Sequence, residues 1–148
     1  MYIVSACLLG EPCRYDGKDN LTDWVKKLTE DHTICMVCPE TLGKLPVPRL
    51  RSEIKNGAVI NEKGEDVTKA FEEGARIAYI RALTAAMSIG EEIEGAILKS
   101  NSPSCGRDKV YDGTFSGNLV YGEGIFAKTL REHGIKIYTE KEILKENF

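Results

Sequence analysis

Short apolar runs alternate with longer amphipathic stretches along most of this chain. Four of the runs are rich in Ile, Val, Leu or Ala and too short to be buried helices, a pattern that predicts buried parallel strands. These runs are Tyr2 to Ser5, Thr33 to Val37, Gly95 to Lys99 and Ile135 to Tyr138.

Apolar residues recur at helical spacing in the stretches between these runs. We expect helices over Leu21 to Glu30, with Asn20 as the N-cap, over Val67 to Ile89, with Asp66 as the cap, and over Glu123 to His133. Strands that alternate with helices predict a parallel sheet covered on both faces. The pattern therefore predicts an α/β fold: a single-domain, three-layer αβα, Rossmann-like arrangement with a mostly parallel sheet over residues 1–148.

The remaining segments predict loops and small elements. Pro39 to Arg51 holds three prolines and one glycine, so we expect an ordered loop there and no regular helix. Ala58 to Ile60 predicts a short strand, and Val110 to Tyr121 predicts a loop or a short hairpin. Thr139 to Glu142 is a capping box, which predicts a short terminal helix.

Composition and charge narrow the classes of function. The chain has 148 residues and a formal net charge of −3, which gives no case for a broad nucleic-acid-binding face. DNA is therefore not expected as a partner, and a tRNA is disfavoured, although Lys44, Arg49 and Arg51 could form a small basic patch. No apolar run is long enough to span a bilayer, and no signal segment precedes the first strand pattern. We expect a cytoplasmic protein with a small-molecule substrate.

Three of the five cysteines lie in segments that follow predicted strands: Cys38 comes at once, Cys7 after one residue and Cys105 after five. An odd number of cysteines in an apparently cytosolic chain argues against a disulfide framework. Cys7, Cys38 and Cys105 each come after an apolar run, and parallel strands end at one edge of their sheet, where ligands bind. Three distant thiols could therefore meet at a soft metal centre. Cys35 lies within a strand and is typical of a small buried hydrophobe.

Several thiol chemistries are compatible with this spacing. A Cys–His nucleophile is disfavoured, because His32 and His133 lie near helix C-termini and away from the cysteine loops. Zinc is possible, but Cys35 and Cys38 would point to opposite faces of a strand unless a turn begins between them. An iron–sulfur cluster fits the thiols better, and three protein ligands would leave one iron open as a Lewis acid.

Polar side chains gather around the same predicted strand ends. Glu40 follows Cys38 by two residues, so its carboxylate stays near any metal there and could act as a general acid or base. The groups that could bind a substrate are Ser100, Ser102, Ser104, Arg49, Arg51 and Lys99. Tyr-Asp-Gly occurs twice, at residues 15–17 and 111–113. Turn chemistry alone could explain both copies, and a shared functional role is the alternative.

Seven segments, in this order, resemble the DUF523 family, which includes the thiouracil desulfidases. They are Ser5 to Gly10, Cys13 to Gly17, Cys38 to Glu40, Leu45 to Arg49, Gly64 to Thr68, Ser102 to Gly106 and Tyr111 to Gly117. The resemblance covers nearly the whole chain. Leu50 to Ser52 departs from the proline that the family commonly shows there, and this departure concerns the substrate side of the site.

The resemblance implies a [4Fe–4S] cluster bound by three cysteines and a non-redox desulfuration of a thiolated pyrimidine. By motif, the ligands would be Cys7, Cys38 and Cys105, with Cys13 in reserve. Glu40 and a serine, Ser102 by preference, would be catalytic. Ser104, Arg49 and Lys99 are the expected substrate-binding groups.

The expected substrate is 2-thiouracil, 4-thiouracil or a related thionucleobase, and the expected products are the oxygenated base and hydrogen sulfide. Free base, nucleoside and tRNA-borne thiouridine remain open at this point. Two other classes of function stay in consideration: a sulfur-transfer enzyme that passes sulfur to a carrier, and a metal- or redox-sensing binding module.

Overall fold

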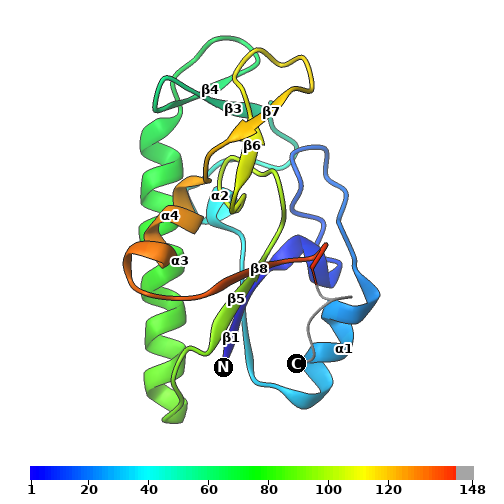
Figure 1. Cartoon of the computed structure of the whole chain (residues 1–148), viewed down its shortest axis with the longest axis vertical. Coiled ribbons are helices and arrows are strands. Elements are labelled where there is room, and N and C mark those ends of the chain that lie inside the picture. Colours follow the sequence, from blue (N-terminus) through cyan, green and yellow to red (C-terminus); the bar gives the residue numbers. More distant parts are fainter. Residues whose placement is uncertain (143–148) are drawn as a thin grey trace.

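The computed structural model of the chain describes residues 1–142 and is built around a parallel sheet (Figure 1). The sheet has four strands in the order β2-β1-β5-β8, and every neighbouring pair is parallel. The strands are β1 (Tyr2–Ser5), β2 (Ile34–Val37), β5 (Gly95–Leu98) and β8 (Ile137–Thr139). All four predicted strands are therefore confirmed, β1 with the predicted bounds and the other three with ends that differ by at most two residues.

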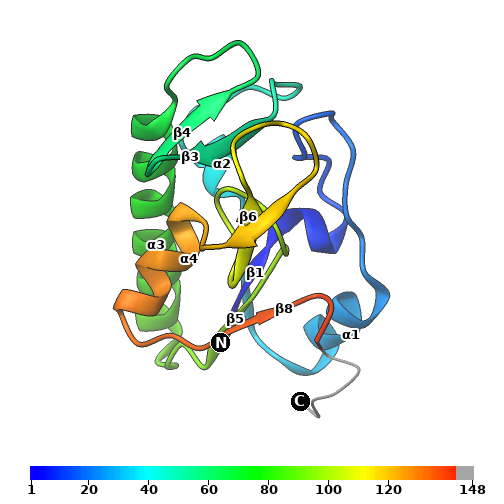
Figure 2. The ribbon, with the colours of Figure 1, turned by 45° about the horizontal axis from the view of Figure 1, so that its top comes forward.

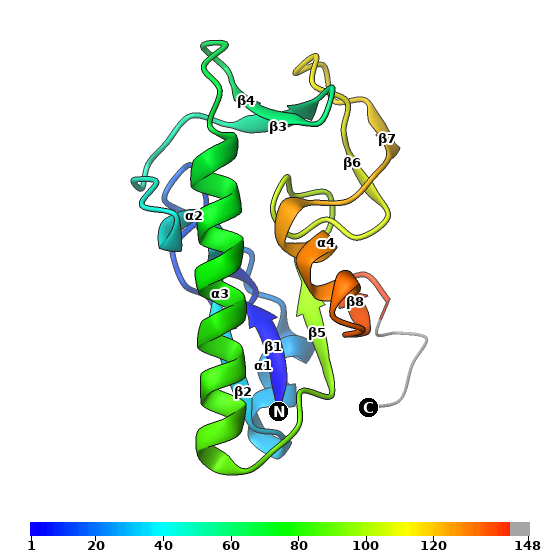
Figure 3. The same cartoon turned by 90° about the vertical axis from the view of Figure 1, so that its left-hand side faces the viewer.

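Helices cover both faces of this sheet, so the predicted three-layer fold is confirmed. The long helix α3 (Thr68–Ile89) and α4 (Ile125–Glu132) lie on one face, and α1 (Asp23–Asp31) lies on the other (Figure 3). Alternate strand residues serve the two cores, because successive side chains in a strand point to opposite faces. Ile3 belongs to the cluster under α3 and α4, while Val4 belongs to the cluster under α1.

The predicted loop after β2 begins with a helical turn, so that part of the prediction was wrong. The turn is α2 (Pro39–Leu42), with Pro39 at its first position, where a fixed φ and a missing N–H cost nothing. Gly43 and Gly74 let α2 lie directly against α3. A Cβ on Gly74 would come within 1.8 Å of the Pro39 carbonyl oxygen. The expectation that proline excludes a helix was wrong here, because proline is well tolerated at the first position of a helix.

The two predicted helix N-caps, Asn20 and Asp66, were both wrong by one or two residues. Asn20 is not the N-cap of α1, because that helix begins at Asp23 and has Thr22 as its N-cap. Asp66 is not the N-cap of α3 either, because that helix begins at Thr68 and has Val67 as its N-cap. The Asp66 carboxylate still accepts a hydrogen bond from the Thr68 amide at 2.9 Å, from one residue outside the N-cap.

Two small antiparallel hairpins lie beyond the carboxyl ends of the central strands (Figure 2). One pairs β3 (Ser52–Lys55) with β4 (Ala58–Asn61), and the other pairs β6 (Lys109–Tyr111) with β7 (Leu119–Tyr121). The hairpin option for the second segment is thus confirmed. The terminal helix expected after Thr139 falls mostly outside the described residues. Within residues 1–142, no helix has the length and apolar character needed to cross a membrane.

Candidate metal centre

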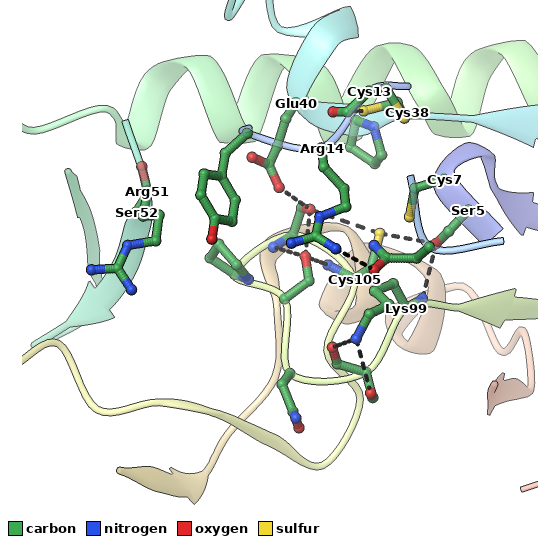
Figure 4. Close-up of a pocket in the computed structure, with 18 of the residues that line it drawn as sticks. Ser5, Cys7, Cys13, Arg14, Cys38, Glu40, Arg51, Ser52, Lys99 and Cys105 are labelled. Carbon is green, nitrogen blue, oxygen red and sulfur yellow. Dashed lines mark hydrogen bonds between the residues drawn. The ribbon is translucent and has the colours of Figure 1, made fainter. Parts of the chain in front are cut away.

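The three predicted ligand cysteines line one cavity at the carboxyl edge of the sheet. Cys7 lies on η1 (Ala6–Leu9), a short 3₁₀ turn that follows β1, and Cys38 joins β2 to α2. Cys105 lies in the loop that follows β5. The cavity has a volume of about 390 Å³, and all three cysteines line it (Figure 4). The sheet therefore brings together three thiols that are far apart in the sequence.

A fourth thiol, that of Cys13, lines the same cavity. It hydrogen-bonds with the side chains of Cys7 and Cys38, and these bonds are the main reason why the pKa of the Cys7 thiol is lowered and that of Cys38 falls to about 6. The same contacts raise the pKa of the Cys13 thiol. Cys35 is buried in the sheet core, as predicted, and does not line the cavity.

Cys105 lies deepest of the four cavity cysteines. Its burial raises the pKa of its thiol to about 12, and the Ser5 hydroxyl donates a hydrogen bond to the sulfur at 3.3 Å. The backbone before it serves as the cap of α4, because the amides of Phe126 and Ala127 donate to the Ser104 carbonyl at 2.8 and 3.1 Å. The loop that carries Cys105 is therefore held at this point both to β1 and to α4.

The predicted acid–base residue, Glu40, has a serine directly beside it. The Ser104 hydroxyl donates to Oε2 of Glu40 at 2.8 Å and lies 2.9 Å from the Ser102 hydroxyl. The Ser102 oxygen accepts the backbone amides of Ser104 and Cys105 at 3.1 and 3.0 Å. Because an ionised carboxylate only accepts hydrogen bonds, Ser104 donates to Glu40 and Ser102 donates to Ser104.

Arg49 holds the other oxygen of the same carboxylate. Its Nε donates to Oε1 of Glu40 at 3.0 Å, and the two side chains are only 7 % and 17 % exposed. Its other nitrogens donate to the carbonyls of Pro46 and Cys13, at 3.3 and 2.8 Å. Each nitrogen of this guanidinium thus has a protein partner, although the side chain lines the cavity.

Lys99 and Ser100 line the cavity on the β5 side and share an acidic partner. The Lys99 ammonium donates to the Ser100 carbonyl at 3.0 Å and lies 3.3 Å from Glu140 Oε2. Ser100 donates its amide and its hydroxyl to the Glu140 carboxylate. The substrate-binding roles predicted for Lys99, Arg49 and Ser104 stay predictions, but all three side chains reach the cavity.

Some other residues that line the cavity were not given a place in the site from the sequence. Tyr15 and Tyr111 both line the cavity, so the repeated Tyr-Asp-Gly was a usable signal. Asn20 lines it too, and its side-chain oxygen accepts a hydrogen bond from Arg14. Glu53 is buried at 6 % exposure and gave no signal, because the strand that carries it was not predicted.

The donor set fits an iron–sulfur cluster better than a single ion. Among residues 1–142, no group of three His, Cys, Asp or Glu side chains could hold one metal ion. Four thiols line one cavity, and an iron–sulfur cluster, which is larger than a single ion and takes cysteine thiolates as ligands, suits this donor set. Neither histidine belongs to this set, because His32 packs against Tyr2 and His133 stacks on Tyr79.

A three-layer α/β fold with a thiol-lined cavity at the edge of a parallel sheet defines a class of small proteins suited to a metal cluster. The chain belongs to the 2-thiouracil desulfurase family, which matches residues 2–142. The resemblance to the DUF523 family is thereby confirmed.

Two similar proteins extend this assignment. A solved structure described as the [4Fe-4S]-dependent thiouracil desulfidase TudS (DUF523Vcz) is 40% identical, with a TM-score of 0.84 over 97% of this chain and 93% of that chain. The uncharacterized protein YbbK of Bacillus subtilis (strain 168) is 36% identical over 155 residues and covers 97% of both chains.

Proposed function

We propose that this chain is a [4Fe–4S]-dependent desulfidase, which removes sulfur from a thiolated nucleobase of the thiouracil type by non-redox C–S hydrolysis. The family match and the similarity to TudS support the reaction class. The observation that carries the proposal is that Cys7, Cys38 and Cys105 line one cavity together with the hydrogen-bonded pair of Glu40 and Ser104.

Cys7, Cys38 and Cys105 are the residues that would hold the cluster. When bound, a [4Fe–4S] cluster with three protein ligands supplies a Lewis-acidic iron with affinity for sulfur. The net reaction turns C=S and water into C=O and hydrogen sulfide. No electron is gained or lost, so the protein must supply only proton transfers and the orientation of the base.

The protons move through Glu40 and the two serines. With Glu40 ionised, its carboxylate takes a proton from the attacking water, and it returns that proton to a ring nitrogen or to the leaving sulfur. Ser104 is the direct neighbour of the carboxylate, at 2.8 Å, and Ser102 donates to Ser104. We therefore assign Ser104 the contact with Glu40 and Ser102 the outer position of the same relay.

Arg49 acts through Glu40. Its bond to Oε1 fixes the carboxylate plane, which leaves Oε2 aimed at Ser104. Since every nitrogen of Arg49 has a protein partner, we assign it to positioning rather than to the substrate. Lys99 lines the β5 side of the cavity and keeps the substrate-binding role. Because its ammonium is paired with Ser100 and Glu140, it would exchange one of these partners for the substrate.

The test is anaerobic reconstitution with iron and sulfide, followed by loss of thione absorbance from 2- and 4-thiouracil and by assay of free sulfide. General acid–base groups contribute about 10²–10⁴-fold to rates, so Glu40→Gln should lower kcat by about that factor while iron content is retained. Glu73→Gln is the matched control, because that carboxylate is exposed on α3 and pairs with Arg76.

Two outcomes would overturn the proposal. A fully loaded protein that leaves both thiouracils intact would refute the substrate class. Sulfur recovered as persulfide on an acceptor, with no free sulfide, would indicate a sulfur-transfer enzyme instead.

A further inference from the structure

Cys13 is a cavity thiol to which the proposed reaction gives no role. It lies in the loop between η1 and α1 and lines the same cavity as Cys7, Cys38 and Cys105. Its side chain hydrogen-bonds with those of both Cys7 and Cys38. Figure 4 shows Cys13 and Cys38 side by side at the thiol end of the cavity, away from Arg51 and Ser52. A fourth sulfur thus lies next to two of the three proposed ligands.

The backbone of Cys13 is held at the cavity wall. Nη2 of Arg49 donates to the Cys13 carbonyl at 2.8 Å, and the Cys13 amide donates to the Glu11 carbonyl at 2.8 Å. The Cys38 thiol also approaches that Cys13 carbonyl, at 4.0 Å. With both backbone groups engaged, the thiol moves chiefly by rotation about one side-chain bond. It therefore stays within reach of whatever the other three cysteines hold.

The known ligand preference of iron–sulfur clusters favours a thiol in this position as a further ligand. Four cysteine thiolates are the usual ligand set of a four-iron cluster, and soft thiolate sulfur is preferred to water by these irons. A thiol fixed beside the cluster competes intramolecularly, without the entropic cost that a ligand from solution pays. An iron left open by three cysteines would therefore bind the thiolate of the fourth cysteine in preference to water.

We propose that Cys13 is a displaceable fourth ligand, which caps the iron that Cys7, Cys38 and Cys105 leave open and withdraws when substrate enters. This inference rests on the proposed function of the cavity as a cluster site. Capping forms one iron–sulfur bond and releases the thiol proton to water, and withdrawal reverses both changes. No oxidant or reductant takes part. The cap would protect the corner of the cluster that is most easily lost.

The first test is differential alkylation of the full chain under anaerobic conditions. The reconstituted protein and the cluster-free protein are treated with iodoacetamide, and each cysteine is quantified by peptide mass spectrometry. Because a metal-bound thiolate is a poor nucleophile, Cys13 should be alkylated at least about tenfold more slowly in the loaded protein, as slowly as Cys7 and Cys38. Rapid alkylation of Cys13, with Cys7 and Cys38 still protected, would overturn the proposal. Cys35, outside the cavity, is the internal control.

The second test uses the stability of the cluster corner. Oxidation with ferricyanide converts a four-iron cluster that has an open corner to a three-iron cluster, which electron paramagnetic resonance detects. Cys13→Ser, with a hydroxyl that is a poor ligand for this iron, should convert severalfold faster than the wild-type protein. Cys35→Ala removes a thiol outside the cavity and should convert at the wild-type rate. Equal rates in all three proteins would refute the cap.

Failure of this inference can be told apart from failure of the proposed function. A protein that assembles no four-iron cluster, by iron and sulfide analysis, contradicts the proposed function itself. A protein that assembles the cluster and consumes thiouracil, but leaves Cys13 open to alkylation, contradicts the cap alone. The alkylation test needs only the wild-type chain, so it remains decisive even where Cys13→Ser fails to fold.

Discussion

Gly74→Ala should disturb the metal site from a distance, because α3 supports α2 through this glycine. A Cβ on Gly74 would lie 1.8 Å from the Pro39 carbonyl oxygen and 3.0 Å from the Gly43 nitrogen. Pro39 lies between Cys38, a proposed ligand, and Glu40, the proposed acid–base residue. Any movement that relieves this overlap therefore moves both functional side chains together.

The magnitude follows from that contact. The Pro39 oxygen must retreat from 1.8 Å to at least 3.0 Å, the shortest separation that real Cβ atoms show, a shift of about 1.2 Å. Overpacking of this kind costs about 1–3 kcal/mol, and alanine in place of glycine within a helix returns about 1 kcal/mol. The net loss of stability should thus be modest, about 0–2 kcal/mol. A misplacement of about 1 Å at a reacting group can cost about 10²-fold in rate, so turnover should suffer far more than stability.

The assay compares urea unfolding, iron content and thiouracil turnover for Gly74→Ala and for Thr84→Ala, an exposed position on the same helix. Thr84→Ala should change none of the three by much, because it adds helix propensity without a clash. A Gly74→Ala protein that gains about 1 kcal/mol and keeps wild-type turnover would refute the claim that α2 rests on this glycine.

The remaining predictions concern the side chains around the cavity. Arg49→Lys keeps the charge but cannot bridge the Glu40 carboxylate and the neighbouring loop carbonyl, so kcat should fall at least about tenfold with iron content intact; unchanged kcat would remove its positioning role. Ser104→Ala should lower kcat without destabilising the fold. Ser102→Ala should lower kcat and also cost about 1–3 kcal/mol in urea unfolding, because the amides of Ser104 and Cys105 lose their hydrogen-bond acceptor. Equal stabilities of the two variants would contradict the assigned bonds. Glu53 lines the cavity, and its Oε1 accepts the backbone amides of Gly113 and Phe115. Glu53→Ala should therefore raise KM and cost about 1–3 kcal/mol in urea unfolding, while Glu53→Gln retains an acceptor and should cost less; the reverse order would contradict these two bonds.

The three cysteines of the site could be predicted from the sequence because of one rule of topology. Parallel strands end at a common edge, so the segments that follow β1, β2 and β5 were expected to bring their cysteines toward one another. The apolar runs that define those strands are short and strongly apolar, and therefore recognisable without neighbours. The helical spacing of Phe71, Ala75 and Ala78 was equally local, and all three are buried on α3.

What sequence reasoning missed depends on contacts that the local pattern does not contain. Glu53 lies in a strand that reads as polar and exposed, yet its Oε1 accepts the amides of Gly113 and Phe115 at 3.0 and 3.1 Å from the distant hairpin. Likewise, nothing in the spacing of Ser102 and Ser104 could decide which hydroxyl meets Glu40. That choice is made by the turn, in which the Ser102 oxygen is occupied by two backbone amides.

The Cys105 loop shares its hydrogen bonds with α4, and this has a consequence for the lifetime of the holoprotein. The first amides of α4 are satisfied by carbonyls of the residues that precede Cys105, and Gly124 allows the helix start to approach them closely. Opening of α4 would therefore loosen the deepest sulfur at the same moment. The rate at which iron is lost should therefore rise and fall with the rate of hydrogen exchange at the α4 amides. Opening of this short helix would then set the lifetime of the bound cluster.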